Sequence, residues 1–149
     1  EKGPKVIEYN CRFGDPEAQA VLPLLRSDLL TVMLATLHGT LEQTEVSFDP
    51  GASCCVVLAS GGYPGGYVAG REIKGLDAPR EAGVYHFHGG TRRLSSGGLV
   101  TAGGRVLGVT ATADTLPQAV AKAYRACENI SFEGMYRRGD IGQRAVCAL

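Results

Sequence analysis

The segment VIEYNCRFGDPE, residues 6–17, combines a polar triplet at two-residue spacing with a signal for the start of a helix. Successive side chains of a β-strand point to opposite faces, so an extended segment would project Glu8, Asn10 and Arg12 from one face. Cys11 would then point to the other face, where we expect it in the core. We interpret the triplet as a functional strand face; the alternative is a half-solvated edge strand whose polar face has no role.

The triplet offers the side chains of a metal site and of an anion site. The oxygen atoms of Glu8 and Asn10 suit a hard divalent cation such as Mg²⁺. Arg12 beside them supplies a fixed positive fork for a phosphate or a carboxylate. All three are therefore candidate site residues.

A helix is predicted directly after the triplet. Gly14 interrupts the strand, and Asp15 is a favoured N-cap residue. Pro16 fits the first helical position, and Glu17 falls in the first turn. The start of a helix also favours bound anions, through its free N–H groups and its dipole. For Asp15 and Glu17 themselves we expect the structural role of capping the helix and complementing its dipole.

Residues 1–45 are predicted to contain two helices after the opening strand. The first helix is interrupted near Pro23, and the second begins at the Ser27–Asp28 cap and ends at Gly39. We expect its apolar residues to form a buried stripe, made of Leu29, Leu30, Val32, Met33, Leu34 and Leu37. A polar connection, residues 42–52, then leads to the second part of the chain.

Residues 46–149 are predicted to form a small mixed α/β domain with an antiparallel sheet. Strands are expected at four places, residues 54–59, 84–88, 99–101 and 105–113. The last two strands would pair through a tight turn at Gly103–Gly104. A helix over 115–129 should pack through one face, made of Ala119, Val120, Ala123, Tyr124 and Cys127. The predicted fold class is therefore α+β.

Composition indicates a globular cytoplasmic protein. The chain has 149 residues with 44% hydrophobic content, which suits one or two small domains. Its 15 Lys+Arg balance 15 Asp+Glu, so no overall field would attract nucleic acid or an anionic membrane. No apolar run has the length of a membrane span, and no signal peptide is recognisable. The 5 cysteines form no C-x-x-C pair, which favours reduced thiols in the cytoplasm.

Two further motifs are interpreted as structural. The loop GGYPGGY, residues 61–67, lacks the Lys-Ser/Thr ending of a P-loop and the glycine spacing of a dinucleotide site. Backbone turns therefore explain it better than phosphate binding. His86 and His88 would share a strand face, but no third ligand lies at a suitable spacing, so we expect no zinc site there.

Arg105 is the candidate site residue of the second part. It follows Gly103 and Gly104, which let a ligand approach the backbone closely, and it begins an apolar strand. An arginine at such a turn can bind a phosphate through its fork of donors. The alternative is an ordinary surface arginine after a hairpin turn.

Five motifs resemble, in the same order, the carboxyl-terminal part of the phosphoribosylamine–glycine ligase family: VIEYNCRFGDPEAQAVLPLL, LASGGYPGGY, HFHGGT, TAGGRVLGVTA and FEGMYRRGDIGQRA. These ATP-grasp ligases of purine biosynthesis, also called glycinamide ribonucleotide synthetases, join glycine to 5-phosphoribosylamine and cleave ATP to ADP and phosphate. The resemblance implies the end of an ATP-grasp domain with a helical linker in residues 1–45, and a small carboxyl-terminal domain in residues 46–149. Family members are much longer, so it also implies an amino-terminal part of the same enzyme as a partner of this chain.

The resemblance further implies roles for individual residues. Glu8 and Asn10 match the positions that hold Mg²⁺ or Mn²⁺ at the phosphates of ATP. Arg12 matches a catalytic arginine near the transferred phosphate and the glycine carboxylate, in a reaction that passes through glycyl phosphate. Arg105 matches an arginine that holds the ribose phosphate of phosphoribosylamine in related enzymes. The lysines and the glycine-rich lid that grip the nucleotide would lie before Glu1, so we expect this chain alone to be inactive.

Two other functions are compatible with the same residues. The chain could be a non-catalytic remnant that binds a phosphoribosyl ligand through Arg105. Alternatively, it could belong to an ATP-grasp ligase that acts on another small acid. Phosphoribosyl binding without any response to nucleotide would favour the remnant, whereas a substrate panel on a full-length enzyme would reveal the other ligase.

Overall fold

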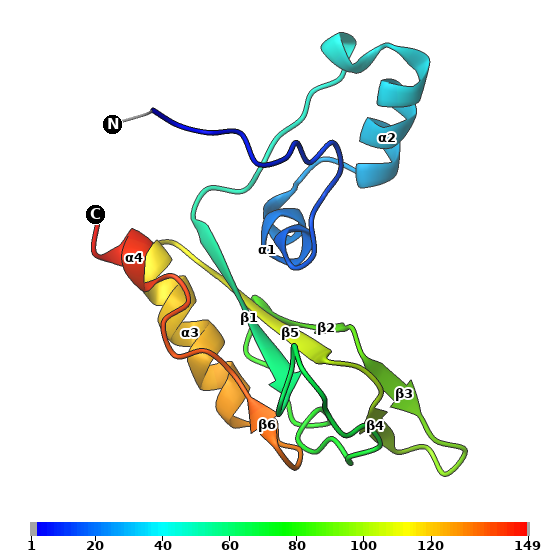
Figure 1. Ribbon diagram of the computed structural model, residues 1–149. Coiled ribbons are helices and arrows are strands. Elements are labelled where there is room, and N and C mark those ends of the chain that lie inside the picture. Colours follow the sequence, from blue (N-terminus) through cyan, green and yellow to red (C-terminus); the bar gives the residue numbers. More distant parts are fainter. Residues whose placement is uncertain (1–2, 149) are drawn as a thin grey trace.

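The computed structural model describes residues 3–148 as a twisted sheet with helices on both of its faces (Figure 1). No helix in this range is long and apolar enough to cross a membrane. The elements are, in chain order, α1 (Glu17–Val21), η1 (Leu22–Leu24), α2 (Leu29–His38), η2 (Leu41–Gln43), β1 (Ala52–Ser60), β2 (Val84–His88), β3 (Thr91–Arg93), β4 (Leu99–Thr101), β5 (Arg105–Ala113), α3 (Leu116–Glu128), β6 (Met135–Tyr136) and α4 (Gln143–Val146).

The main sheet has four strands in the order β2-β5-β1-β6, and its neighbouring strands are antiparallel. β1 and β5 are its long central pair, with Ala52 opposite Ala113 and Leu58 opposite Leu107. β2 lies along the other edge of β5, where Val84 is opposite Ala111. The predicted mixed α/β fold with antiparallel pairing is confirmed at this level.

Helix α3 covers one face of the sheet and closes the core. Its N-terminus has a capping box made by Thr115 and Gln118, in which the Gln118 side chain accepts a hydrogen bond from the Thr115 N–H at 3.2 Å. Alternate residues of β1 point at the helix, and Val56 and Leu58 have no exposed surface. Full burial of one such side chain stabilises the fold by about 1.5–3 kcal/mol. The predicted apolar face of α3 is confirmed: Ala119, Val120, Ala123 and Cys127 are buried in the core, and Tyr124 is partly buried against it.

The opposite face of the sheet is only partly covered, by α1. The buried hydroxyl of Thr110 donates a hydrogen bond to the Gln19 carbonyl oxygen at 2.9 Å. Gly108 lies beside this contact, and a Cβ atom there would lie 3.2 Å from Cys55 Sγ. The tight contact at Gly108 is thus with Cys55 of the neighbouring β1, whereas Gln19 of α1 would lie at an ordinary 3.8 Å. The rest of the face stays open to form pockets.

Helix α2 has the predicted ends but not the predicted burial. Its Asp28 cap accepts a hydrogen bond from the Thr31 N–H at 2.7 Å, and Gly39 ends the helix with φ 69°. Of its residues only Ala35 is buried, while Leu34 is 45% and Leu37 is 76% exposed. The predicted buried stripe is thus wrong within residues 3–148, because α2 lies away from the sheet (Figure 1) and nothing in that range covers it.

The short hairpin β3–β4 corrects the predicted strand pairing. Leu99–Thr101 pairs with Thr91–Arg93 in a separate two-stranded sheet, and not with β5. After β4 the ladder with the β3 side continues for one more residue, because Ala102 donates its N–H to the Gly90 carbonyl oxygen at 2.7 Å. The turn at Gly103–Gly104 therefore carries the chain from one sheet into the other.

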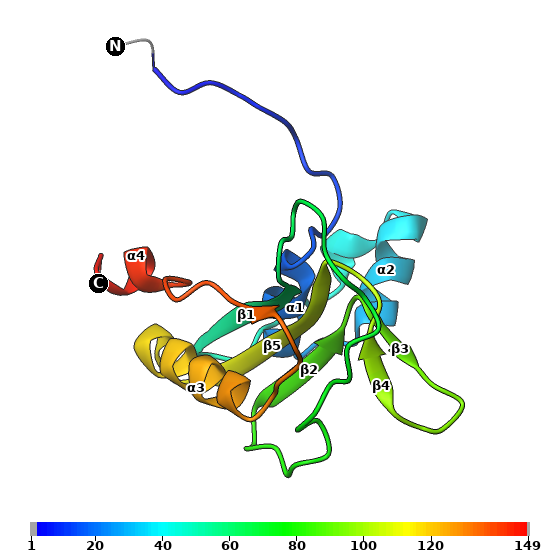
Figure 2. The same ribbon diagram turned by 60° about the horizontal axis from the view of Figure 1, so that its bottom comes forward.

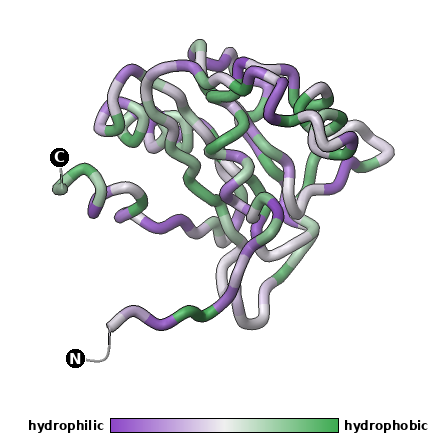
Figure 3. Tube along the Cα trace, turned by 90° about the horizontal axis from the view of Figure 1, so that it is seen from above, coloured by the Kyte–Doolittle hydropathy of each residue, from purple (hydrophilic) through white to green (hydrophobic). Residues whose placement is uncertain are grey.

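The amino-terminal segment, residues 3–13, forms no strand with any other part of the described chain. It runs outside the body of the molecule (Figure 2), and its apolar stretch is visible in Figure 3. Ile7 is 96% and Tyr9 is 83% exposed. Cys11 is exposed as well, which corrects its predicted place in the core. The predicted opening strand is therefore not formed within the described residues, because the segment has no neighbouring strand to pair with there.

Candidate functional site

The sequence-predicted site residues line one pocket of about 550 Å³, here called the amino-terminal pocket. Glu8, Asn10 and Arg12 come from the opening segment, whereas Arg105 comes from the start of β5. Asn10 Nδ2 donates a hydrogen bond to Glu8 Oε1 at 3.4 Å, so these two side chains point to the same side. Arg12 Nη1 donates to the Phe13 carbonyl oxygen at 3.2 Å. Residues about ninety positions apart in the sequence thus meet at one pocket.

Asp15 joins the two parts of this pocket. Arg105 Nη1 donates a hydrogen bond to the Asp15 carbonyl oxygen at 2.8 Å, and Arg105 Nη2 lies 3.1 Å from Asp15 Oδ2. The predicted capping role of Asp15 is wrong: the N-cap of α1 is Pro16, and no side chain caps it. Local rules suggested a cap because they could not include a partner from the distant strand β5. Glu17 does lie in the first turn of α1, as predicted.

Arg105 also borders two further pockets on the open sheet face. One, of about 440 Å³, is called the tyrosine pocket here; it lies among Val57, Tyr63, Arg105, Tyr136 and Arg138. The other, of about 490 Å³, has Gln19, Phe87, His88 and Arg105 in its wall. The guanidinium therefore stands where three pockets meet. A residue at such a junction can contact a ligand that extends across the sheet face.

The tyrosine pocket contains residues that the sequence did not single out. The ring of Tyr63 packs directly against Gly104, so a Cβ atom at that position would collide with the ring. The loop at 61–67 was interpreted as a set of turns, yet its Tyr63 and Pro64 form a wall of this pocket. The order of the elements could have indicated this role for the loop. The loop directly follows β1, and β1 is the sheet neighbour of β5, which carries Arg105.

Arg138, which also lines the tyrosine pocket, is held by two hydrogen bonds to Asp140. Its Nε donates to Asp140 Oδ1 at 2.8 Å, and its Nη2 to Asp140 Oδ2 at 2.6 Å. The hydrogen bond from Arg138 holds the pKa of the Asp140 carboxyl below its usual range. Neither residue was predicted as part of a site.

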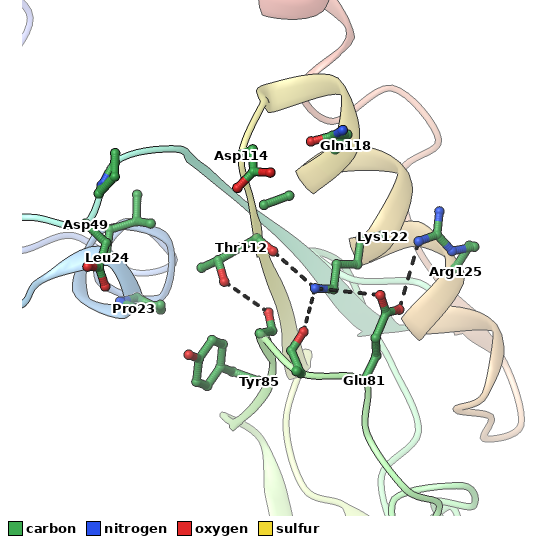
Figure 4. Close-up of a pocket in the computed structure, with 14 residues that line it drawn as sticks. Pro23, Leu24, Asp49, Glu81, Tyr85, Thr112, Asp114, Gln118, Lys122 and Arg125 are labelled. Carbon is green, nitrogen blue, oxygen red and sulfur yellow. Dashed lines mark hydrogen bonds and ion pairs between the residues drawn. The ribbon is translucent and has the colours of Figure 1, made fainter.

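Another pocket, of about 570 Å³, lies between α3, the end of β5 and the loop before β2, and is shown in Figure 4. Its Lys122 is only 15% exposed and contacts three oxygen atoms, those of the Ala82 and Thr112 carbonyls and of the Glu81 carboxylate. An ammonium group has three donors, so Lys122 is fully used in holding the loop to the sheet. The polar side chains of this pocket serve the fold, and we do not assign it to function.

The histidines form no metal centre within residues 3–148, where no three His, Cys, Asp or Glu side chains gather around a common point. His88 Nδ1 lies 3.0 Å from the Thr91 hydroxyl. Burial lowers the pKa of His86, and the nearby charges of Arg80 and His88 lower it further. Because no such cluster within residues 3–148 includes Glu8 and Asn10, a cation bound by these two residues would need further ligands from substrate and water.

The fold and the pockets define a class: a small α/β domain whose open sheet face presents an arginine beside oxygen donors that suit a cation. A family model described as "Phosphoribosylglycinamide synthetase, C domain" matches residues 53–144. The chain therefore belongs to the phosphoribosylglycinamide synthetase C-domain family. The predicted resemblance to phosphoribosylamine–glycine ligases is confirmed.

Individual relatives agree with this family. A phosphoribosylamine–glycine ligase of Synechocystis sp. is 52% identical over 143 residues, which are 95% of this chain and 34% of the relative. The trifunctional purine biosynthetic protein adenosine-3 of Gallus gallus is 48% identical over 148 residues, or 99% of this chain and 15% of the relative. The crystal structure of a phosphoribosylamine–glycine ligase from Thermotoga maritima superposes with a TM-score of 0.77 and 35% identity, over 93% of this chain and 33% of that one. The chain thus spans about a third of the ligases that it matches.

Proposed function

We propose that this chain supplies the carboxyl-terminal third of an ATP-dependent phosphoribosylamine–glycine ligase of purine biosynthesis. Family membership supports the proposal, and the observation that carries it is the meeting of Glu8, Asn10, Arg12 and Arg105 at one pocket. The other two thirds of the enzyme would be the partner of this chain and would bind the adenine and the phosphates of ATP in an ATP-grasp fold. The expected setting is the cytoplasm.

The oxygen donors in the amino-terminal pocket suit Mg²⁺ or Mn²⁺. A carboxylate and an amide oxygen are hard ligands, and Mg²⁺ is commonly held by one or two carboxylates together with phosphate groups and water. The contact between Asn10 and Glu8 keeps the two side chains close enough to share one cation. Bound there, such an ion would neutralise charge on the phosphates of ATP.

The two arginines would divide the remaining charges of the reaction. A glycine carboxylate oxygen attacks the γ-phosphorus of ATP, ADP leaves, and glycyl phosphate is formed. Arg12 would stabilise the negative charge on the transferred phosphoryl group. The amine of phosphoribosylamine then attacks the acyl carbon, phosphate leaves, and the nitrogen loses a proton. Arg105 would hold the ribose phosphate so that the amine reaches the acyl carbon.

A chimera tests this function. We would replace the matching third of the Synechocystis ligase with this chain and measure ADP formation that depends on glycine and phosphoribosylamine. We expect activity in the chimera, none in this chain alone, and a loss of about 100-fold in kcat for Glu8→Gln. Glu133→Gln is the matched control. Glu133 forms an ion pair with Arg71, at 2.7 Å between the two side chains, and lines none of the pockets described above.

Three results would contradict the proposal. A folded chimera that binds ribose 5-phosphate but has no turnover would indicate the non-catalytic remnant. A chimera that uses another small acid in preference to glycine would indicate a different ligase. Turnover by this chain alone would show that its nucleotide site had been misplaced.

A further inference from the structure

The contacts of Arg105 leave one edge of its guanidinium group open. Nη1 donates to the Asp15 carbonyl oxygen at 2.8 Å, and Nη2 lies 3.1 Å from Asp15 Oδ2. A guanidinium group has five N–H donors in a planar fork, and these contacts occupy the edge formed by its two terminal nitrogens. Within residues 3–148 the Nε–H of Arg105 has no acceptor. The second edge, formed by Nε and a terminal nitrogen, therefore remains available for two oxygen atoms of one anion.

Asp15 is itself fixed by the opening helix. Gln19 Nε2 donates a hydrogen bond to Asp15 Oδ1 at 2.8 Å, so each carboxylate oxygen of Asp15 has its own partner. Gln19 is held to the sheet in turn, because its carbonyl oxygen accepts a hydrogen bond from the buried Thr110 hydroxyl. The result is a chain of contacts from β5, through α1, back to the start of β5.

The ion pair between Asp15 and Arg105 is of the kind that contributes little to stability. Both side chains are largely exposed, at 62% and 43%, and exposed pairs are screened by water. What the contacts do fix is direction, since the two distances fit only one orientation of the planar group. Asp15 also lies in the segment that carries Glu8 and Asn10, so it sets the position of Arg105 relative to them.

We infer that Asp15 is a positioning residue for substrate: it holds one edge of Arg105 so that the other edge receives the phosphate of phosphoribosylamine. The inference rests on the proposed function and adds a residue to it. Without the Asp15 carboxylate, Arg105 would keep its charge and its hydrogen bond to the carbonyl oxygen of residue 15, but it would lose the second contact, which sets the direction of the planar group. Binding of the phosphate would weaken, while the binding of ATP and glycine would not depend on this contact.

The test is Asp15→Asn in the chimera, because asparagine has the same shape without the charge. We expect the KM for phosphoribosylamine to rise by about 5- to 20-fold, with kcat and the KM for ATP and glycine within about two-fold. The inhibition constant of ribose 5-phosphate should rise in parallel. The KM for phosphoribosylamine should rise further in Arg105→Ala. The double variant, Asp15→Asn with Arg105→Ala, should have the same KM as Arg105→Ala alone, because Asp15 acts only through Arg105.

Each outcome separates this inference from the proposed function. Glu133→Gln breaks another exposed ion pair and should leave all constants unchanged. An unchanged or lower KM in Asp15→Asn, while Arg105→Ala raises it, would overturn the positioning role alone, and a lower KM would mean that Asp15 competes with the phosphate. An inactive chimera with native residues would overturn the proposed function instead. Asp15→Ala, with melting curves for each variant, distinguishes misfolding from loss of orientation.

Discussion

Burial divides the 5 cysteines into those that can react and those that cannot. Cys54 and Cys127 lie in the core between the sheet and α3, whereas Cys11 and Cys147 are exposed. Burial, together with smaller contributions from the neighbouring Cys55 and Cys127, raises the pKa of the Cys54 thiol to about 11. The reaction proposed above needs no covalent nucleophile, and the buried Cys54 and Cys127 contribute to the packing of the core.

Alkylation should reproduce this division. At pH 8, a thiol with a pKa of about 11 is ionised in about one molecule in a thousand, and only the thiolate reacts. We therefore expect iodoacetamide to modify Cys11 and Cys147 first and to leave Cys54 and Cys127 protected until the chain is unfolded in urea. Mass spectrometry of peptides over time measures each site. Modification of Cys54 in the folded chain as fast as Cys11 would contradict the packing.

Element by element, the sequence predicted local structure well and pairing less well. Helix α3 was recognised because its apolar residues recur at helical spacing along one face. The pairing of β4 with β5 was wrong because a Gly–Gly pair suggests a reversal of the chain, whereas here Gly103–Gly104 joins two successive strands that both face the β2–β3 side. For the site, Glu8, Asn10, Arg12 and Arg105 could be named from residue type and spacing, or from family resemblance. Asp15 and Tyr63 could not be assigned, because their partners lie in distant elements.

The turn that leads into β5 depends on a glycine at position 104. A side chain there would push the Tyr63 ring off the turn, so Gly104→Ala should lower stability by about 1–3 kcal/mol and widen the tyrosine pocket next to Arg105. Gly98→Ala is the control, because a Cβ atom at Gly98 meets nothing within 4 Å. Urea unfolding of the two variants checks the difference. Equal stability would mean that the Tyr63 ring has another place at no cost.

For the molecule as a whole, the most unusual feature is apolar surface without a cover. On α2, Leu30 is 63% and Leu37 is 76% exposed, and Ile7 and Tyr9 are further exposed apolar side chains on the opening segment. Large exposed apolar side chains that gather on one helix commonly mark a surface on which another part of a protein packs. The chain spans about a third of the ligases that it matches, so we expect the other two thirds of a ligase to cover α2.

Substitution of the α2 face should have opposite effects in the two settings. In this chain alone, Leu30→Gln with Leu37→Gln should reduce self-association, because it removes exposed apolar surface at no cost in packing. In the chimera, the same double substitution should lower the melting temperature, because each buried leucine contributes about 1.5–3 kcal/mol. Sedimentation velocity and thermal melts measure the two effects, with Leu94→Gln, on an exposed residue after β3, as the control. An unchanged melting temperature in the chimera would show that α2 stays uncovered in the complete enzyme.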